Sequence, residues 1–213
     1  MNTDVLKNYY STIEETRADL FALYYIMDEQ MIRLGLVPSI DAAKAEFDAY
    51  LRNGLLTQLT RIEPGKDIEE SHMRNRQLIA RWVYEAGKAQ NVIEFVRSGE
   101  KTFVKINDYQ ELRILFGQLL KEIQRIKSEG DFDAARNLVE NFGVKVDRQL
   151  HEEVLARFKK LDLAPYAGFL NPVYELKTWP CGTPNDVVIS YEEDYTSQML
   201  RYSKEFGFLP MEN

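Results

Sequence analysis

Cysteine and histidine are scarce in this chain. Its 213 residues include one cysteine, Cys181, and two histidines, His72 and His151. A single cysteine cannot form an intrachain disulfide, so nothing in the sequence requires an oxidising compartment, and we expect a cytoplasmic protein. With no partner for Cys181, its surroundings predict a β-turn and no redox centre. The two histidines are far apart in different predicted helices, so they do not form the closely spaced pair typical of helical zinc sites.

Long apolar runs and an excess of basic residues are also absent. The longest uncharged apolar run, Leu20 to Met27, is far too short to span a bilayer, and the first residues lack the apolar stretch of a signal peptide. The net charge of -7 leaves little to bind a phosphate backbone. We therefore expect neither a membrane nor a nucleic acid as a partner.

The sequence patterns predict a mostly α-helical fold with minor β structure. A capping box at Ser11 and Glu14 predicts the start of the first helix. Residues 92–96 and 102–106 are rich in β-formers around Ser98-Gly99, which predicts a hairpin. Helical spacing and capping residues predict further helices over 39–53, 55–62 with a kink at Gly54, 67–86, 109–127, 132–141, 147–161 and 192–206. Residues 169–178 and 187–191 look extended, and we expect 1–165 and 166–213 to pack as separate units.

The segment Glu14-Glu15-Thr16-Arg17-Ala18-Asp19 places acidic residues in the first turns of a helix. Glu15 and Asp19 are four positions apart and therefore project from one face. One such carboxylate can bind a cation while the other orients a ligand from a neighbouring helix. The alternative is that these residues stabilise the positive end of the helix dipole, with Asp19 solvated.

His72 and Arg76 are also four positions apart on a predicted helix. Together they offer hydrogen-bond donors that could stabilise an oxyanion and hold a peptide carboxylate or carbonyl. The alternative is an exposed histidine beside an arginine that pairs with Glu69 or Glu70.

Two motifs carry a resemblance to a known family. The run from Ser11 to Asp28 resembles the Glu-Glu-x-x-Ala-(Glu/Asp) motif of the dipeptidyl peptidase III zinc metallopeptidases, and the run from His72 to Arg76 resembles the family's His-Met-x-x-Arg sequence. The resemblance extends from about Lys7 to Phe206. It implies the C-terminal part of a family member from the bacterial branch, with residues 1–165 in the helical catalytic lobe.

The resemblance also implies roles for the site residues. Glu15 would be the third zinc ligand, and Glu14 and Asp19 would contact the histidine ligands. His72 would stabilise the transition state and Arg76 would bind substrate. Glu175 stands about where family members carry an arginine, which leaves the contacts to the C-terminal side of a substrate open.

Family members take their other two zinc ligands from an upstream His-Glu-x-x-x-His helix, and that motif is absent here. We therefore expect zinc in the full-length parent, which would release dipeptides from the N-termini of oligopeptides, but neither stoichiometric zinc nor activity in this chain alone. The other interpretation is a noncatalytic helical domain that binds a peptide or protein. In either case, apolar surface exposed by truncation should favour self-association.

Overall fold

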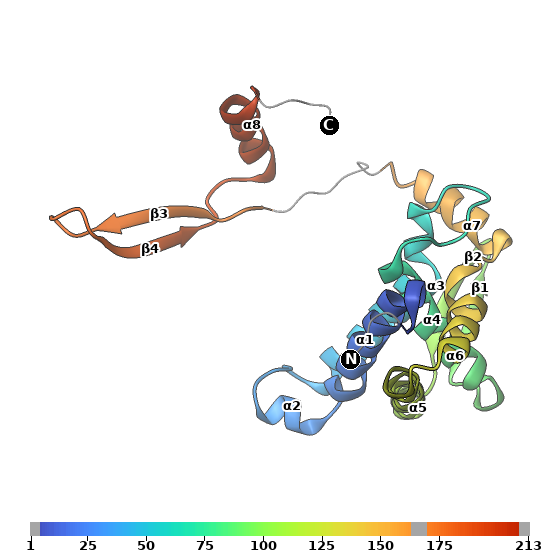
Figure 1. The fold of residues 1–213 in the computed structure, drawn as a ribbon. Helices are drawn as coiled ribbons and strands as arrows, with labels where there is room; N and C mark the ends of the chain where they lie inside the picture. The colour runs from blue at the N-terminus through green and yellow to red at the C-terminus, as the bar shows by residue number, and fades with distance from the viewer. Residues whose placement is uncertain (1–4, 163–169, 209–213) are drawn as a thin grey trace. The chain divides into compact units, whose positions relative to one another are not determined.

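The computed structural model describes residues 5–162 and 170–208. By its contacts the chain divides into two compact units, residues 1–162 and residues 163–213, and each is described by itself. The boundary expected between residues 165 and 166 lies outside the described residues. Most described residues are helical, and two small antiparallel sheets accompany the helices (Figure 1). The predicted fold class is therefore confirmed.

The first helix begins earlier than the sequence predicted. A 3₁₀ turn, η1 (Lys7–Tyr9), leads directly into α1 (Tyr10–Ile26), and no side chain caps the junction. The predicted capping box at Ser11 is therefore wrong, because the backbone is already helical there. The hydroxyl of Ser11 instead donates a hydrogen bond to Ser71 Oγ (3.2 Å). A short helix, α2 (Glu29–Arg33), follows α1.

The third helix, α3 (Ile40–Leu55), is capped by Ser39, includes Gly54 and ends one residue after it, where Leu56 has non-helical torsions. A Cβ at Gly54 would lie 2.6 Å from the backbone carbonyl oxygen of Arg76, on the neighbouring helix. The glycine therefore permits a close helix approach, which sequence alone does not distinguish from a kink. A 3₁₀ helix, η2 (Thr57–Arg61), occupies the region predicted to continue as helix.

The fourth helix, α4 (Ser71–Ala86), is shorter than the predicted 67–86 helix. The Glu70 carboxylate accepts hydrogen bonds from the backbone N–H groups of His72 and Met73 and so fixes the helix start. After the 3₁₀ turn η3 (Lys88–Gln90) come β1 (Ile93–Ser98) and β2 (Lys101–Ile106), which pair antiparallel. The hairpin predicted around Ser98-Gly99 is confirmed.

The rest of the first unit is helical. Asp108 caps α5 (Tyr109–Glu129), and Gly130 ends it with a positive φ of 69°. Next come α6 (Phe132–Val139), a π-helical turn η4 (Glu140–Val144) and α7 (Arg148–Lys159).

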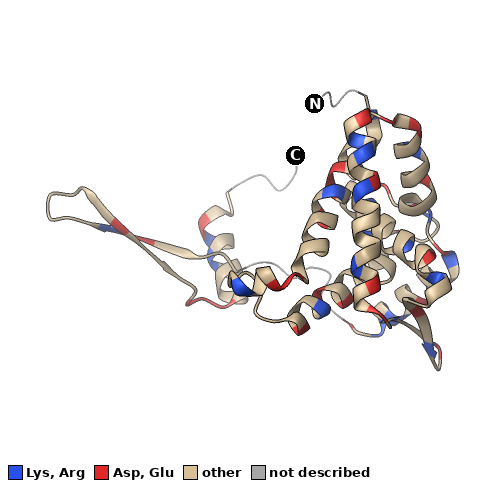
Figure 2. Cartoon of the chain, turned by 90° about the horizontal axis from the view of Figure 1, so that it is seen from below, with Lys and Arg blue, Asp and Glu red and all other residues tan. Residues whose placement is uncertain are grey.

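One contiguous cluster of apolar side chains forms the core of the first unit. It lies where α1 packs against α4 and α5, and where α3 packs against α4. The fully buried rings of Phe47 (α3) and Phe116 (α5) meet edge to face within it, with centroids 5.0 Å apart. This packing fixes α1, α3 and α4 relative to one another. Lys and Arg are interspersed with Asp and Glu over these helices (Figure 2).

The second unit consists of a hairpin and a helix. Strands β3 (Val173–Thr178) and β4 (Pro184–Ser190) pair antiparallel, and α8 (Tyr195–Phe206) follows. The side chain of Gln198 bonds the backbone of Asn171 in both directions, at 2.7 and 2.8 Å, which ties the helix to the strand start. Within the described ranges, no helix is both long and apolar enough to cross a membrane.

Candidate functional site

The acidic motif and the histidine motif face each other across α1 and α4. Ser11 contacts Ser71 and Glu15 contacts His72, and further along both helices Asp19 contacts Asn75. These three contacts advance in the same direction on the two helices, so they form one polar seam. The seam joins segments that are far apart in the sequence.

Glu15 and His72 make the central contact of this seam. His72 Nδ1 lies 3.3 Å from Glu15 Oε2, within ion-pair distance. The side chain of Glu15 is 34% exposed and that of His72 is 56% exposed, so both remain accessible from solvent. Glu15 is thus placed to act as a ligand or to orient the imidazole, and the imidazole is placed to meet a bound molecule.

Asp19 is held more firmly than Glu15. Its Oδ2 accepts hydrogen bonds from the Tyr50 hydroxyl (2.8 Å) and from Asn75 Nδ2 (3.1 Å). Burial, reinforced by the negative charge of Asp19, raises the pKa of Tyr50 well above its usual value, so Tyr50 stays protonated and continues to donate. Asp19 therefore has a fixed orientation, which a carboxylate that positions another group requires.

Sequence reasoning missed both partners of Asp19. Asn75 lies one helical turn beyond His72 and is 1% exposed, and a buried asparagine needs hydrogen-bond partners. Its place within the histidine motif was an available signal. Nothing in the sequence connects Tyr50, on α3, with Asp19.

Glu14 pairs with two basic side chains and not with His72. Its carboxylate pairs with Arg17 (2.6 Å) and with Lys127 of α5. The side chain of Lys127 is only 8% exposed, and burial lowers its pKa. Glu14 therefore links α1 to α5. Its carboxylate takes no part in the contact between Glu15 and His72.

Arg76 follows His72 by one turn and is half-buried. Its positive charge partly opposes the rise in the pKa of Tyr50 that burial and Asp19 cause. Within the described part of the chain it makes no ion pair or side-chain hydrogen bond, and Glu70 is used as the cap of α4. The alternative pairing of Arg76 with Glu69 or Glu70 is therefore not formed, and its donors are free for a ligand.

A comparison of the chain with protein-family models matches residues 2–160 to peptidase family M49. The chain belongs to peptidase family M49. The resemblance to the dipeptidyl peptidase III family is thereby confirmed. A search of solved structures supports the fold. It matches the structure of DPP III from Caldithrix abyssi with a TM-score of 0.51 and 23% identity.

That match covers 74% of this chain and 27% of the Caldithrix abyssi chain. The M49 chain therefore spans about a quarter of the length of the structure it resembles. No curated protein matches it.

The side chains that can coordinate zinc in this M49 chain are histidine, cysteine, aspartate and glutamate. Among residues 5–162 and 170–208, no group of three or more His, Cys, Asp or Glu side chains converges. A catalytic zinc takes three protein ligands, and the face described here offers the Glu15 carboxylate beside one imidazole. The Glu15 carboxylate is therefore the donor that this face can contribute to such a site.

Three other residues discussed from the sequence, His151, Glu175 and Cys181, contact neither Glu15 nor His72 in the described part of the chain. His151 is buried, and its Nε2 lies 3.1 Å from the carbonyl oxygen of Ile62. Glu175 lies on β3 in the second unit and pairs with Lys177. Cys181 lies in a turn closed by a hydrogen bond from the Gly182 N–H to the Trp179 carbonyl, as its sequence predicted.

Proposed function

We propose that this M49 chain supplies one face of a zinc-dependent dipeptidyl peptidase site, whose parent protein releases dipeptides from the N-termini of oligopeptides. The observation that supports this most is the 3.3 Å approach of His72 to Glu15. Two motifs, each ambiguous alone, meet on one open surface. Structural ion pairs do not require both partners to remain accessible, whereas a site does.

Each residue then has a role. Glu15 is the zinc ligand of this face, and Asp19, held by Tyr50 and Asn75, orients a histidine ligand. His72 donates a hydrogen bond to the oxyanion that develops as the peptide bond is attacked. Arg76 binds a carbonyl or carboxylate of the peptide.

Glu14 is proposed to act indirectly. Its pairs with Arg17 and Lys127 tie α1 to α5 and so fix the turn that carries Glu15. When bound, zinc supplies a polarised carbonyl and a water of lowered pKa. The remaining ligands are proposed to come from a His-Glu-x-x-x-His segment elsewhere in the parent.

Metal analysis of the 213-residue chain tests this division of the site. After dialysis against metal-free buffer, we expect well under one zinc per chain and no cleavage of a fluorogenic dipeptidyl amide. One tightly held equivalent of zinc would show that the chain completes the site by itself.

A second candidate is a noncatalytic peptide-binding domain. It is favoured by the free donors of Arg76 and the exposure of His72, which could hold a peptide carboxylate without metal. Saturable binding of an oligopeptide to the zinc-free chain, lost in Arg76→Gln, would favour it if the parent gene encodes no His-Glu-x-x-x-His segment.

A further inference from the structure

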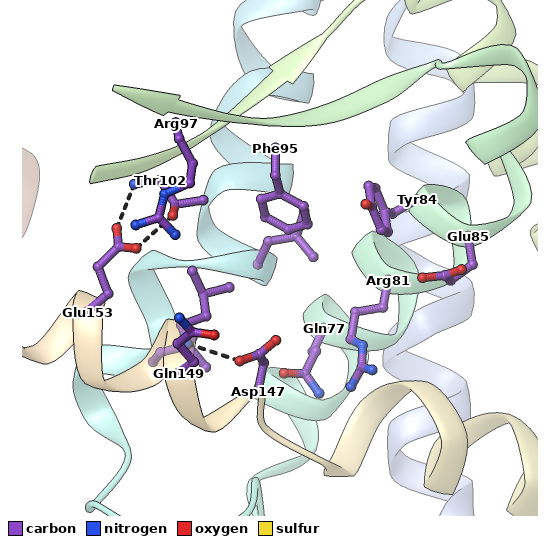
Figure 3. Close-up of a pocket in the computed structure, with 13 residues that line it drawn as sticks. Gln77, Arg81, Tyr84, Glu85, Phe95, Arg97, Thr102, Asp147, Gln149 and Glu153 are labelled. Atoms are coloured by element: carbon purple, nitrogen blue, oxygen red, sulfur yellow. Dashed lines mark hydrogen bonds between the residues drawn. The ribbon is translucent and has the colours of Figure 1, made fainter. Parts of the chain in front are cut away.

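The first unit contains a cavity that the proposed peptidase site does not use. It has a volume of about 280 Å³ and lies between α4, α7 and the β1–β2 hairpin (Figure 3). None of Glu15, Asp19, His72 and Arg76 lines it. Its size is close to that of small-molecule pockets, which begin at roughly 300 Å³.

The hairpin presents one of its faces to this cavity. Phe95 and Arg97 are two apart on β1 and so point to the same side of the strand. Thr102 pairs directly with Arg97 across the hairpin, so it shares that face. All three line the cavity, which is therefore built on regular structure rather than on a loop.

The carboxylates around the cavity are already engaged. Glu153 accepts from the backbone N–H and the hydroxyl of Thr102, both at 2.6 Å, and from Arg157 at 3.2 Å. Asp147 accepts from the Leu150 N–H at the start of α7. Glu85 pairs with Lys88 at 3.2 Å. Their negative charges are thus partly compensated.

The two arginines that line the cavity retain free donors. Arg97 makes no ion pair or side-chain hydrogen bond with any residue that the structure describes. Arg81 donates one hydrogen bond, from Nη1 to the carbonyl oxygen of Lys145 (2.7 Å). Because guanidinium groups bind carboxylate and phosphate through several parallel N–H donors, the cavity is suited to an anion.

The wall beside these donors is aromatic and apolar. Phe95 and Tyr84 meet edge to face, with centroids 5.0 Å apart, and Leu55 and Leu59 add aliphatic surface. Figure 3 shows Phe95 between Arg97 on one side and Tyr84 on the other. A planar group lying along Phe95 would bring an attached anion to Arg97.

We propose that this cavity binds a small amphipathic anion, a carboxylate or phosphate monoester that carries one planar apolar group. Arg97 binds the anion, and Phe95 and Tyr84 contact the planar group. The proposal is independent of the peptidase activity and of zinc. It therefore stands or falls separately from the proposed function.

Phenyl phosphate, benzoate, inorganic phosphate and the neutral analogue benzamide test it. Each is titrated into the ¹⁵N-labelled 213-residue chain up to about 10 mM, a range that detects the weak binding expected of such small probes. Phenyl phosphate or benzoate should saturate and shift the backbone amides of Thr102 and Gln149. Whichever anion binds more tightly identifies the ligand class. Inorganic phosphate should bind more weakly than phenyl phosphate because it lacks the ring.

The matched variants are Arg97→Gln and Arg52→Gln. Arg52 is also exposed and without a side-chain partner among the described residues, but it does not line the cavity. R97Q should weaken the better anionic probe by about tenfold, the effect of losing a charge-assisted hydrogen bond. It should leave the affinity for benzamide unchanged. R52Q should bind every probe with the affinity of the unsubstituted chain.

Three results would overturn the proposal. These are no saturable binding of either aromatic anion, equal affinity of R97Q and R52Q for the better aromatic anion, and an affinity for that anion no higher than for inorganic phosphate. Circular dichroism of both variants establishes that a lost signal is not lost folding.

Discussion

His72 Nδ1 lies 3.3 Å from Glu15 Oε2, across the seam between α4 and α1. The contact gives the two motifs a shared surface on which Glu15 can hold a cation and His72 can face a substrate. Because the imidazole contacts Glu15 through Nδ1, the opposite ring nitrogen, Nε2, is directed away from the carboxylate. It is the proposed donor to the oxyanion, a role that requires the imidazolium form, in which Nδ1 donates to Glu15 while Nε2 also carries a proton.

Substitution of His72 in the active parent protein separates this role from zinc binding. His72→Ala should lower kcat by about a hundredfold, the usual effect of losing one oxyanion donor, with little change in KM. Zinc content should stay at the level of the unsubstituted enzyme. Loss of zinc together with activity would instead make His72 a ligand.

The hydroxyl of Tyr50 should matter for stability. Tyr50→Phe removes the single hydroxyl proton that Asp19 Oδ2 (2.8 Å) and Asn75 Oδ1 (3.1 Å) share, so a half-buried and a buried acceptor lose this donor. The free energy of unfolding should fall by about 1–3 kcal/mol, measured by urea denaturation. Tyr25→Phe is the control, since the Tyr25 hydroxyl makes no hydrogen bond within the described ranges. Equal stability of the two variants would mean that the hydrogen bonds among Asp19, Tyr50 and Asn75 do not contribute to the free energy of unfolding.

Gly54→Ala should be destabilising, although alanine normally favours a helix. The new methyl group would lie 2.6 Å from the Arg76 carbonyl oxygen and 2.9 Å from the Ala80 side chain. The steric conflict should lower the free energy of unfolding by about 1–3 kcal/mol. Asn53→Ala, one position earlier in α3, controls for helix propensity. If G54A is as stable as N53A, the helices do not approach so closely.

Asp67 should make stability depend on pH. The hydrogen bond from Lys145 Nζ (2.8 Å), together with the charges of Lys145 and Arg148, lowers its pKa against the opposing effect of burial. A carboxyl group with a lowered folded pKa contributes fully above its unfolded pKa of about 3.9, and the contribution is lost as the pH falls through the folded value.

Asp67→Asn should therefore lower the free energy of unfolding by up to about 1 kcal/mol at pH 7, since the side chains of Lys145 and Arg148 are 70% and 46% exposed and solvent screens both pairs. The difference from the unsubstituted chain should shrink as the pH falls below about 4. Asp41→Asn is the control, because Asp41 is 91% exposed and 3.4 Å from Lys44. A difference that grows in acid would contradict the assignment.

Self-association is proposed to use the β3–β4 hairpin of the second unit. Tyr174 pairs with Ile189 and Leu176 with Val187, so four apolar side chains share one hairpin face. All four are exposed within the part of the chain that the structure describes. A two-stranded hairpin is marginal by itself in water, and a second copy can cover this face.

Sedimentation velocity tests this surface. The chain should sediment as a dimer at tens of micromolar, and Leu176→Lys should shift it to monomer. Val188→Lys should leave the dimer intact, because Val188 pairs with Glu175 on the opposite face. A monomer without any substitution, or dimers in all three proteins, would rule this face out.

The sequence predicted what local patterns determine. Residues 93–106 form the expected hairpin because β-rich runs flank Ser98-Gly99, and α5 ends at Gly130, whose positive φ suits a C-terminal glycine. The start of α4 was misplaced because acidic residues that can cap a helix occur at several neighbouring positions. Glu70, and not Asp67, provides the cap.

Contacts between distant segments were predictable only where the family resemblance supplied them. The resemblance placed Glu15 and His72 in one site, and the structure brings them together. Neither the bond from Tyr50 to Asp19 nor the cavity beside Phe95 has a local signature. Both depend on how α3, α4 and the hairpin pack.

Zinc stoichiometry in the parent protein tests whether Glu15 is a zinc ligand. Zinc per chain is measured for a longer form of the protein that carries a His-Glu-x-x-x-His segment and for its Glu15→Gln variant, with Glu29→Gln as control. We expect one zinc in the unsubstituted protein and in E29Q, and a loss of about 10–100-fold in zinc affinity or more in E15Q. A full equivalent held equally tightly by E15Q would contradict the account.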